Sequence, residues 1–429
     1  MAADIKILYE RFKESGKVST DTRKITRGSV FFSLRGEKFN ANEFAADALE
    51  KGASYAVVDE AKWVKDERYV LVEDVLQTLQ QLARYHRDQL KIPVIALTGS
   101  NGKTTTKELL NVVLSKKYKV LATQGNLNNH IGVPLTVLSI DKTYDMAIVE
   151  MGANHLGEIA TLCEIANPTH GLITNIGKAH IGTFGGYDNI VRGKSELYQH
   201  LIKTDGIVWI NSQSSVLANM SKRFKAPLFY PASGDYYHCE KLSADPYLKV
   251  KTAEGDIIQT HLIGEYNFEN VAAALCVGKT FEVDPMAAKQ AIAGYSPDNM
   301  RSQVVTKGTN TIILDAYNAN PSSMEVALKS LGQMNANRKV AILGDMYELE
   351  EESEAEHRKI ADWLSSNAID EALLCGELIK VAATDDYVSK YFPSKEELIA
   401  YLKSQPIREA TILIKASRGM ALEKVVDYL

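Results

Sequence analysis

The stretch that decides the fold is Thr98-Gly99-Ser100-Asn101-Gly102-Lys103-Thr104-Thr105-Thr106. The apolar run 92–97 before it is typical of a buried strand, and in 107–118 after it leucine and valine recur at helical spacing. Backbone N–H groups of a glycine-rich turn at the start of a helix bind phosphate, while Lys103 adds a positive charge and a threonine hydroxyl can bind magnesium. The sequence therefore predicts a site for ATP or GTP at this strand-to-helix junction.

The loop is shorter than the ordinary nucleotide-binding pattern, G-x-x-x-x-G-K-[ST]. That pattern requires glycine at position 97, where this chain has Leu97, and the first glycine comes at Gly99. A polar turn with incidental glycines is the alternative interpretation. Two glycines, a lysine and three threonines at one strand-to-helix boundary favour the phosphate-binding loop, although they do not name a reaction.

The composition is that of a globular protein with more than one domain. A chain of 429 residues, of which 45% are hydrophobic and 24% charged, usually forms two or three domains. The net charge of -5 gives no reason to expect nucleic acid or an anionic membrane as a partner. The four cysteines are scattered without metal-ligand spacing, as reduced core residues are. No apolar stretch approaches the ~20 residues of a membrane span, and residues 1–10 lack the apolar core of a signal peptide, so we expect a cytoplasmic protein.

The chain divides into three α/β blocks, which we place at residues 1–91, 92–296 and 297–429. We expect a small α/β N-terminal domain, a central P-loop ATPase-like domain with a parallel sheet and flanking helices, and a C-terminal Rossmann-like α/β domain. In the third block, Asn320-Pro321 predicts the N-cap and first position of a helix over 322–334. The predicted strands are 29–34, 55–58, 69–72, 146–151, 171–176, 206–210, 311–315, 339–343, 372–375 and 411–415.

Five polar residues outside the loop are candidates for a nucleotide and metal site. Glu150 lies at the carboxyl end of a predicted strand, where open α/β sheets bind ligands, and a carboxylate there can bind magnesium or simply face solvent. His180 follows the next strand and Lys194 lies on a predicted helix; taken singly, they favour a structural histidine and a surface lysine. Asn267 and Asn270 share one face of a predicted helix, so their amides can bind a base or cap local backbone.

Taken together and in this order, the motifs resemble the Mur ligase family over essentially the whole chain. The asparagine-rich segment 126–134 (Asn-Leu-Asn-Asn-His-Ile-Gly-Val-Pro) and two segments of the third block are more specific to one subgroup of that family than the phosphate loop is. The segments that carry the resemblance are 98–106, 126–134, 150–152, 175–182, Lys194, 264–270, 300–301, 315–321, 344–349 and 415–418.

The resemblance implies an ATP-dependent amide ligase whose partners are UDP-N-acetylmuramoyl-tripeptide and D-alanyl-D-alanine. ATP would phosphorylate the terminal carboxylate of the tripeptide, and the amine of the dipeptide would attack the acyl phosphate and release phosphate. This chemistry makes sense because a carboxylate is a poor acylating agent until its oxygen becomes part of a good leaving group. Two Mg²⁺ ions and domain closure over the nucleotide are also implied. We expect a monomer, because nothing in the sequence points strongly away from one.

The resemblance further implies roles for individual residues. The residues expected to bind ATP are Gly99, Ser100, Asn101, Gly102, Lys103, Thr104, Thr105, Asn267, Asn270, Arg301 and Asp315. The expected metal ligands are Thr104, Glu150, His180 and Lys194, with Lys194 carbamylated by carbon dioxide, which turns a cation into an anion. The expected catalytic residues are Lys103, Lys194, His180 and Arg301. The residues expected to bind the two substrates are Thr22, Arg23, Asn126, Asn128, Asn129, Lys415, Ser417 and Arg418.

Two other functions are compatible with parts of the sequence. Another ligase of the superfamily, one that adds a single amino acid or is similar to folylpolyglutamate synthase, would share the phosphate loop and Lys194. Such a ligase would differ in the first block and around 126–134. A nucleotide switch without ligation would not need the candidate metal ligands to meet at one place.

Two short segments depart from the family pattern. Asn40-Ala41 stands where Asp-Gly is usual, after 36–39, and Ala416 stands where glycine is usual. A methyl group at position 416 is a mild change unless the backbone there needs a positive φ.

Overall fold

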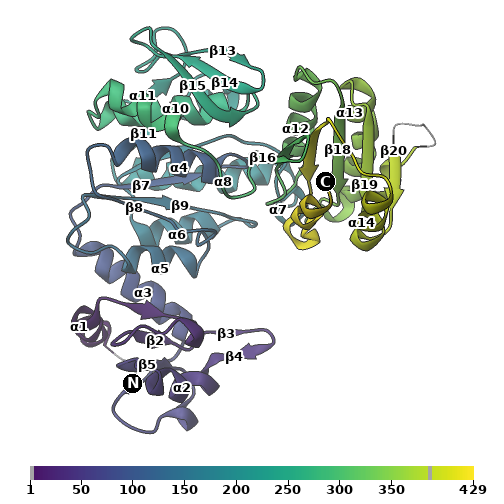
Figure 1. Cartoon of the computed structure of the whole chain (residues 1–429). Coiled ribbons are helices and arrows are strands. Elements are labelled where there is room, and N and C mark those ends of the chain that lie inside the picture. Colours follow the sequence, from purple (N-terminus) through teal and green to yellow (C-terminus); the bar gives the residue numbers. More distant parts are fainter. Residues whose placement is uncertain (1–3, 385–388) are drawn as a thin grey trace.

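The computed structural model describes residues 4–384 and 389–429, and it contains three α/β domains that follow one another along the chain (Figure 1). The first and the C-terminal domain are attached to different sides of the central domain. The expected α/β class with three domains is confirmed. Within the described ranges, no helix is long and apolar enough to cross a membrane.

The first domain is built on a four-stranded parallel sheet in the order β1-β2-β5-β6. Asp4 begins α1 by accepting a hydrogen bond from the backbone of Lys6, and Asp74 begins α3 in the same way through Gln77. The strands are β1 (Val18–Ser19), β2 (Val30–Phe32), β5 (Tyr55–Val58) and β6 (Tyr69–Leu71), with a separate hairpin of β3 (Arg35–Gly36) and β4 (Phe39–Asn40). The helices are α1 (Ile5–Ser15), α2 (Ala45–Glu50) and α3 (Val75–Asp88).

The central domain is built on a six-stranded parallel sheet in the order β12-β11-β10-β7-β9-β8. Every residue of its central strand β7 (Val94–Thr98) is buried, because helices cover both faces of the sheet. The other strands are β8 (Val120–Ala122), β9 (Met146–Glu150), β10 (His170–Ile173), β11 (Ile207–Asn211) and β12 (Leu228–Tyr230). The helices are α4 (Lys103–Leu114), α5 (Gly132–Leu138), α6 (Glu158–Ala166), α7 (Ile181–Phe184), α8 (Tyr187–Lys203), α9 (Ser215–Ser221), α10 (Asn267–Thr280) and α11 (Pro285–Gly294).

A three-stranded antiparallel sheet interrupts the parallel arrangement between β12 and α10, at the top of Figure 1. Its strands are β13 (Glu240–Ala244), β14 (Tyr247–Lys251) and β15 (Ile257–Ile263). The expectation of alternating strands and helices throughout the central block is wrong here. The burial of β15 alternates along the strand, as expected when one face packs on the core and the other faces solvent.

The C-terminal domain has a six-stranded sheet in the order β16-β17-β21-β18-β19-β20, which is parallel except for the pairing of β16 with β17. Asn320 caps α12 in a capping box with Ser323, as Asn320-Pro321 predicts. The strands are β16 (Gln303–Lys307), β17 (Asn310–Leu314), β18 (Lys339–Gly344), β19 (Glu371–Cys375), β20 (Ser389–Phe392) and β21 (Thr411–Lys415). The helices are α12 (Pro321–Gln333), α13 (Ser353–Ser366) and α14 (Lys395–Ser404).

The structure also settles three smaller expectations. All four cysteines are free and buried, as expected for reduced core residues. Helix α4 begins at Lys103 rather than at Lys107, so the phosphate loop runs directly into its first turn. Ala416 is fully buried and has no positive φ, so its methyl group is accommodated without backbone strain.

Candidate active site

The phosphate loop connects β7 to α4 and has a shape that only glycine allows at two positions. Gly99 has a φ of +148°, and a Cβ there would lie 2.0 Å from Thr174 Oγ1. Gly102 has a φ of +76°, and a Cβ there would lie 2.5 Å from Asn270 Oδ1. The loop therefore packs closely against its neighbours and presents its backbone at the N-terminus of α4.

A segment that follows β10 holds the loop in place. The amide of Ser100 donates to the carbonyl of Asn175 at 3.0 Å, and the hydroxyl of Thr174 donates to the carbonyl of Asn101 at 2.6 Å. The Ser100 hydroxyl both donates to the carbonyl of Gly177 at 2.9 Å and accepts from its amide at 2.8 Å. Because this one segment fixes the loop at both Ser100 and Asn101, the loop is preorganised to bind an anion.

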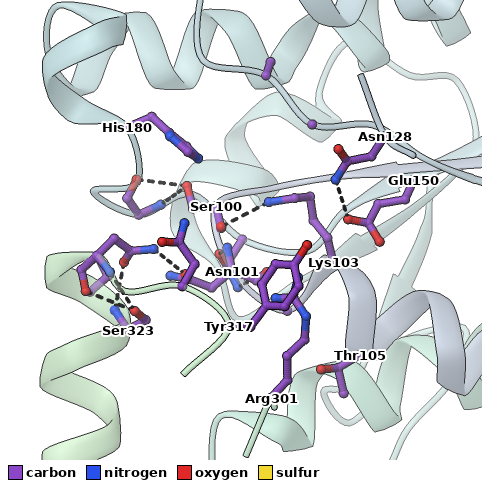
Figure 2. Close-up of a pocket in the computed structure, with 18 of the residues that line it drawn as sticks. Ser100, Asn101, Lys103, Thr105, Asn128, Glu150, His180, Arg301, Tyr317 and Ser323 are labelled. Atoms are coloured by element: carbon purple, nitrogen blue, oxygen red, sulfur yellow. Dashed lines mark hydrogen bonds between the residues drawn. The ribbon is translucent and has the colours of Figure 1, made fainter. Parts of the chain in front are cut away.

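Lys103 is the cation at the start of α4. Its Nζ donates to the carbonyl of Gly99 at 2.7 Å. It also donates to the carbonyl of Ser100 at 3.2 Å (Figure 2). Burial lowers the pKa of Lys103 to about 8, and the nearby Arg301 charge acts in the same direction. An anion at this position would offset that shift and keep the lysine protonated.

Glu150 and Thr104 meet beside the loop. Glu150 ends β9, next to Leu97 of β7, and only 1% of its surface is exposed. Its Oε1 accepts from Thr104 Oγ1 at 3.3 Å and from Asn128 Nδ2 at 2.8 Å. Its Oε2 is buried and has no hydrogen-bond partner in the described part of the chain. A carboxylate with a free oxygen beside a hydroxyl fits a magnesium ion, which prefers oxygen ligands.

Lys194 lies on α8 and is buried, so the interpretation as a surface lysine is wrong. Its Nζ donates to the carbonyl of Ala153 at 3.1 Å and lies 5.1 Å from the ring centroid of Phe184. Burial, and then the charge of Lys103, lower the pKa of Lys194 to about 7. Ala153 belongs to the described wall of the cavity that contains the loop, and Lys194 lies directly next to it. Near neutral pH a large share of this lysine is therefore the uncharged amine.

His180 lies between the central and C-terminal domains. Its Nδ1 is 2.5 Å from Oε2 of Glu348, which belongs to the C-terminal domain, and this contact lowers the pKa of Glu348. Among the described residues, no three His, Cys, Asp or Glu side chains are grouped as a metal site. The side chains that converge as expected metal ligands are thus Thr104 and Glu150, whereas His180 pairs with a carboxylate from across the domain interface.

One cavity of about 930 Å³ has Lys103, Glu150 and His180 on its wall (Figure 2). Its described lining does not include Gly99, Thr104 or Lys194. Asn267 and Asn270 of α10 line it. The Asn270 amide, however, already donates from Nδ2 to Asn267 Oδ1 at 2.9 Å and accepts at Oδ1 from the hydroxyl of Thr106 at 3.0 Å. Further lining residues from the central domain are Ser100, Asn101, Gly102, Lys103, Thr105, Asn126, Asn128, Asn129, Glu150 and His180. Those from the C-terminal domain include Arg301, Asp315, Tyr317, Asn320, Glu348 and Lys415.

The C-terminal domain supplies charged groups to the cavity. The guanidinium of Arg301 lies 3.9 Å from the ring centroid of Tyr317 (Figure 2), and its Nε is buried without a hydrogen-bond partner among the described residues. Asp315 accepts from the amide of Ser302 at 3.0 Å and pairs with Lys415 Nζ at 2.5 Å. The Nε–H of Arg301 is thus available to donate to a ligand, whereas the charges of Asp315 and Lys415 neutralise each other.

The residues expected to bind substrate fall into two groups. Asn126, Asn128, Asn129 and Lys415 line the cavity, although Asn129 Oδ1 also accepts from the amide of Gly132, the first residue of α5, at 2.9 Å. The described lining of the cavity does not include the other four, which are Thr22, Arg23, Ser417 and Arg418. Thr22 and Arg23 lie in the first domain, where Arg23 pairs with Asp21 at 2.9 Å. The Ser417 hydroxyl accepts from the amide of Tyr347 at 2.8 Å, and Arg418 pairs with Glu423 at 3.3 Å.

The lining residues that received no binding role from the sequence include Tyr317, Glu348 and Asn320. Tyr317 stacks on Arg301, Glu348 pairs with His180, and Asn320 Nδ2 donates to Asn101 Oδ1 across the domain interface at 2.8 Å. All three lie in segments that carry the family resemblance. The pattern of each segment gives no signal of the contacts that these side chains make.

One cavity is lined by the phosphate loop of the central domain and by residues of the C-terminal domain, an arrangement that fits an ATP-dependent enzyme whose site lies between two domains. Residues 97–278 match the Mur ligase middle domain, and residues 300–418 match the Mur ligase, glutamate ligase domain. The UDP-N-acetylmuramoyl-tripeptide--D-alanyl-D-alanine ligases of Bacillus subtilis and Escherichia coli are each 34% identical to this chain, over 96% of its length and 92% and 93% of theirs.

Solved structures agree with the sequence comparison. MurF from Acinetobacter baumannii superimposes with a TM-score of 0.86 at 32% identity, over 96% of this chain and 92% of that one. MurF from Thermotoga maritima in complex with ADP gives a TM-score of 0.85 at 27% identity, over 96% of both chains. The chain belongs to the Mur ligase family, and it is an ATP-dependent amide ligase.

Proposed function

We propose that this chain joins D-alanyl-D-alanine to UDP-N-acetylmuramoyl-tripeptide at the expense of ATP. The products are the UDP-muramoyl-pentapeptide, ADP and phosphate. The observation that carries the proposal is the single cavity in which the phosphate loop and Glu150 of the central domain face Arg301 and Lys415 at the C-terminal domain. The near full-length similarity to ligases named for this reaction supports the choice of substrates.

The proposed chemistry has two steps. A carboxylate oxygen of the tripeptide attacks the γ-phosphorus of ATP, the bond to the ADP oxygen breaks, and an acyl phosphate forms. The dipeptide amine then attacks the acyl carbon, loses a proton, and displaces inorganic phosphate. Lys103 and Arg301 stabilise the charge on the transferring phosphoryl group, because both are cations on the wall of one cavity. Mg²⁺ held by Thr104 and Glu150 would neutralise phosphate charge in the same place.

We further propose that Lys194 is carbamylated in the active protein. Its amine would attack carbon dioxide and lose a proton, leaving a carbamate anion suited to a second magnesium ion with His180. Support comes from the burial of Lys194 and its pKa of about 7, since only the uncharged amine is a nucleophile. His180 would exchange Glu348 for that ion.

The remaining assignments follow from the same proposal. Thr22 and Arg23 in the first domain would bind the UDP portion, Asn126, Asn128 and Asn129 the muramoyl portion, and Lys415, Ser417 and Arg418 the dipeptide or the activated carboxylate. Asn267 and Asn270 would lie near the adenine and Asp315 near the ribose.

Domain boundaries at 1–91, 92–296 and 297–429 are supported by the three main sheets, whose strands fall within 18–71, 94–230 and 303–415. Free buried cysteines support a cytoplasmic location, and a cavity built by two domains of one chain supports a monomer.

The test is phosphate release with ATP, Mg²⁺ and UDP-N-acetylmuramoyl-tripeptide, with and without D-alanyl-D-alanine. Tripeptides with lysine and with diaminopimelate at the third position are both supplied. The proposal expects release that requires both substrates, with a pentapeptide product identified by mass. Turnover with a single amino acid but not with the dipeptide would assign the chain to another ligase of the superfamily, and steady hydrolysis without any acceptor would indicate a nucleotide switch.

A further inference from the structure

The dipeptide Gly177-Lys178 lies between the phosphate loop and the C-terminal domain. On one side, the backbone of Gly177 is joined to the hydroxyl of Ser100 by two hydrogen bonds, of 2.9 and 2.8 Å. On the other side, the amide of Lys178 donates to Ser322 Oγ at the start of α12, at 2.9 Å. Two adjacent residues therefore connect the loop that receives phosphate to a helix of the domain that must close over it.

The side chain of Lys178 adds a second contact with the C-terminal domain. Its Nζ lies 2.9 Å from Oε1 of Glu356 on α13. The Glu356 side chain is only 3% exposed, so its carboxylate is shielded from water and an ion pair with it is screened less than one between two exposed groups. Lys178 thus holds α12 through its backbone and α13 through its side chain.

Glu356 has a second partner that provides an internal comparison. Lys359 Nζ lies 2.7 Å from the same Oε1 atom, and Lys359 belongs to α13 itself. The side chains of Lys178 and Lys359 are 45% and 43% exposed. The two ion pairs share the acceptor atom Oε1, and their lysine side chains are almost equally exposed. They differ in that the pair made by Lys178 crosses the domain interface, whereas the pair made by Lys359 lies within one helix.

We infer that Lys178 is a positioning residue that clamps the C-terminal domain onto the phosphate loop when the site closes. The effect of this clamp on turnover rests on the proposed function. In the structure, where this contact is formed, Arg301 and Lys415 line the same cavity as Lys103. A contact that favours the closed arrangement raises the fraction of molecules in which these groups are assembled. Removing Lys178 leaves Glu356 paired with Lys359, so the C-terminal domain keeps its buried carboxylate satisfied.

The experiment compares Lys178→Met with Lys359→Met in the full chain. Small-angle X-ray scattering with ADP and Mg²⁺ measures closure, steady-state kinetics measures kcat and KM, and thermal melting measures stability. We expect Lys178→Met to increase the radius of gyration with nucleotide bound and to lower kcat/KM about fivefold, the size of one ion pair that is partly shielded from water. Lys359→Met should leave scattering and kcat/KM as in the wild type, with any effect confined to melting.

A conservative variant and the choice of readouts complete the test. Lys178→Arg should restore both the compact scattering profile and kcat/KM, because a guanidinium can reach the same carboxylate. Equal effects of the two methionine variants, or scattering of Lys178→Met identical to that of the wild type, would overturn the clamp. The scattering measurement needs only the protein and a nucleotide, so failure of the dipeptide as a substrate would refute the proposed function while the clamp was still tested.

Discussion

Replacing Gly99 by alanine tests whether the close approach of the phosphate loop to its neighbours is needed for activity. The added Cβ would lie 2.0 Å from Thr174 Oγ1 and 3.1 Å from the backbone nitrogen and oxygen of Asn175. Real Cβ atoms stay at least 3.0 Å from such atoms, so either the loop or the Thr174 hydroxyl that holds the loop at Asn101 must move by about 1 Å to relieve the first contact. The φ of +148° adds strain for any residue with a side chain.

A displacement of this size falls on the backbone that faces the phosphates. Misplacing reacting groups by about 1 Å costs about a hundredfold in rate, so Gly99→Ala should lower kcat for phosphate release by about a hundredfold. The nucleotide should also bind more weakly, because the amides of the loop no longer point at one place. Both quantities are measured by steady-state phosphate release and by titration calorimetry with ADP and Mg²⁺.

Gly255→Ala is the matched control. Gly255 lies in the turn between β14 and β15 with a φ of +89°, and a Cβ there meets no described heavy atom within 4 Å. It therefore shares the backbone strain without the clash, and it should keep wild-type turnover. The double variant Gly99→Ala with Thr174→Ala removes the 2.0 Å contact and should recover part of the loss. Turnover of Gly99→Ala within twofold of the wild type would refute the geometry of the loop.

Three further predictions concern a metal ligand, a buried amine and a buried imidazole. Glu150→Gln should raise the Mg²⁺ concentration needed for half-maximal turnover at least about tenfold, because it removes the charge of a carboxylate whose Oε2 has no hydrogen-bond partner among the described residues; an unchanged magnesium titration would contradict this. Lys194→Ala should lose most activity and regain part of it with a short-chain carboxylic acid that replaces the carbamate, and full activity without the acid would remove Lys194 from the site. Burial lowers the pKa of His170 from 6.5 to about 4, so the unfolded chain takes up a proton that the folded chain does not as the pH falls from 6.5 towards 4. The free energy of unfolding should drop by about 2 kcal/mol between pH 7.5 and pH 5, and urea unfolding of His170→Gln should lack that part of the drop.

Local patterns in the sequence predicted the elements that position the site. The strand, glycine-rich turn and helix at 94–114 follow from residue type alone, since glycine, lysine and threonine each have a distinct physical role there. The capping box of Asn320 is likewise a local feature, and it correctly begins α12. Buried parallel strands such as β9 and β21 are recognisable because both of their faces are apolar.

Features that depend on distant contacts could not be predicted in the same way. The antiparallel sheet of β13, β14 and β15 and the short edge strands β12 and β20 carry weak patterns of their own. Lys194 is indistinguishable in sequence from a surface lysine, and its burial results from the packing of α8 against the central sheet. The pairs His180–Glu348 and Asn101–Asn320 join residues more than a hundred positions apart, so only the docking of two domains reveals them.

The most direct test of the central claim follows an oxygen atom through the reaction. UDP-N-acetylmuramoyl-tripeptide carrying ¹⁸O in its terminal carboxylate is incubated with ATP, Mg²⁺ and D-alanyl-D-alanine, and the released phosphate and the peptide product are analysed by mass spectrometry. Attack of the carboxylate on the γ-phosphorus transfers one labelled oxygen to the phosphate and leaves one in the new amide carbonyl. Phosphate without ¹⁸O would show that the carboxylate is not phosphorylated and would contradict the proposed ligation.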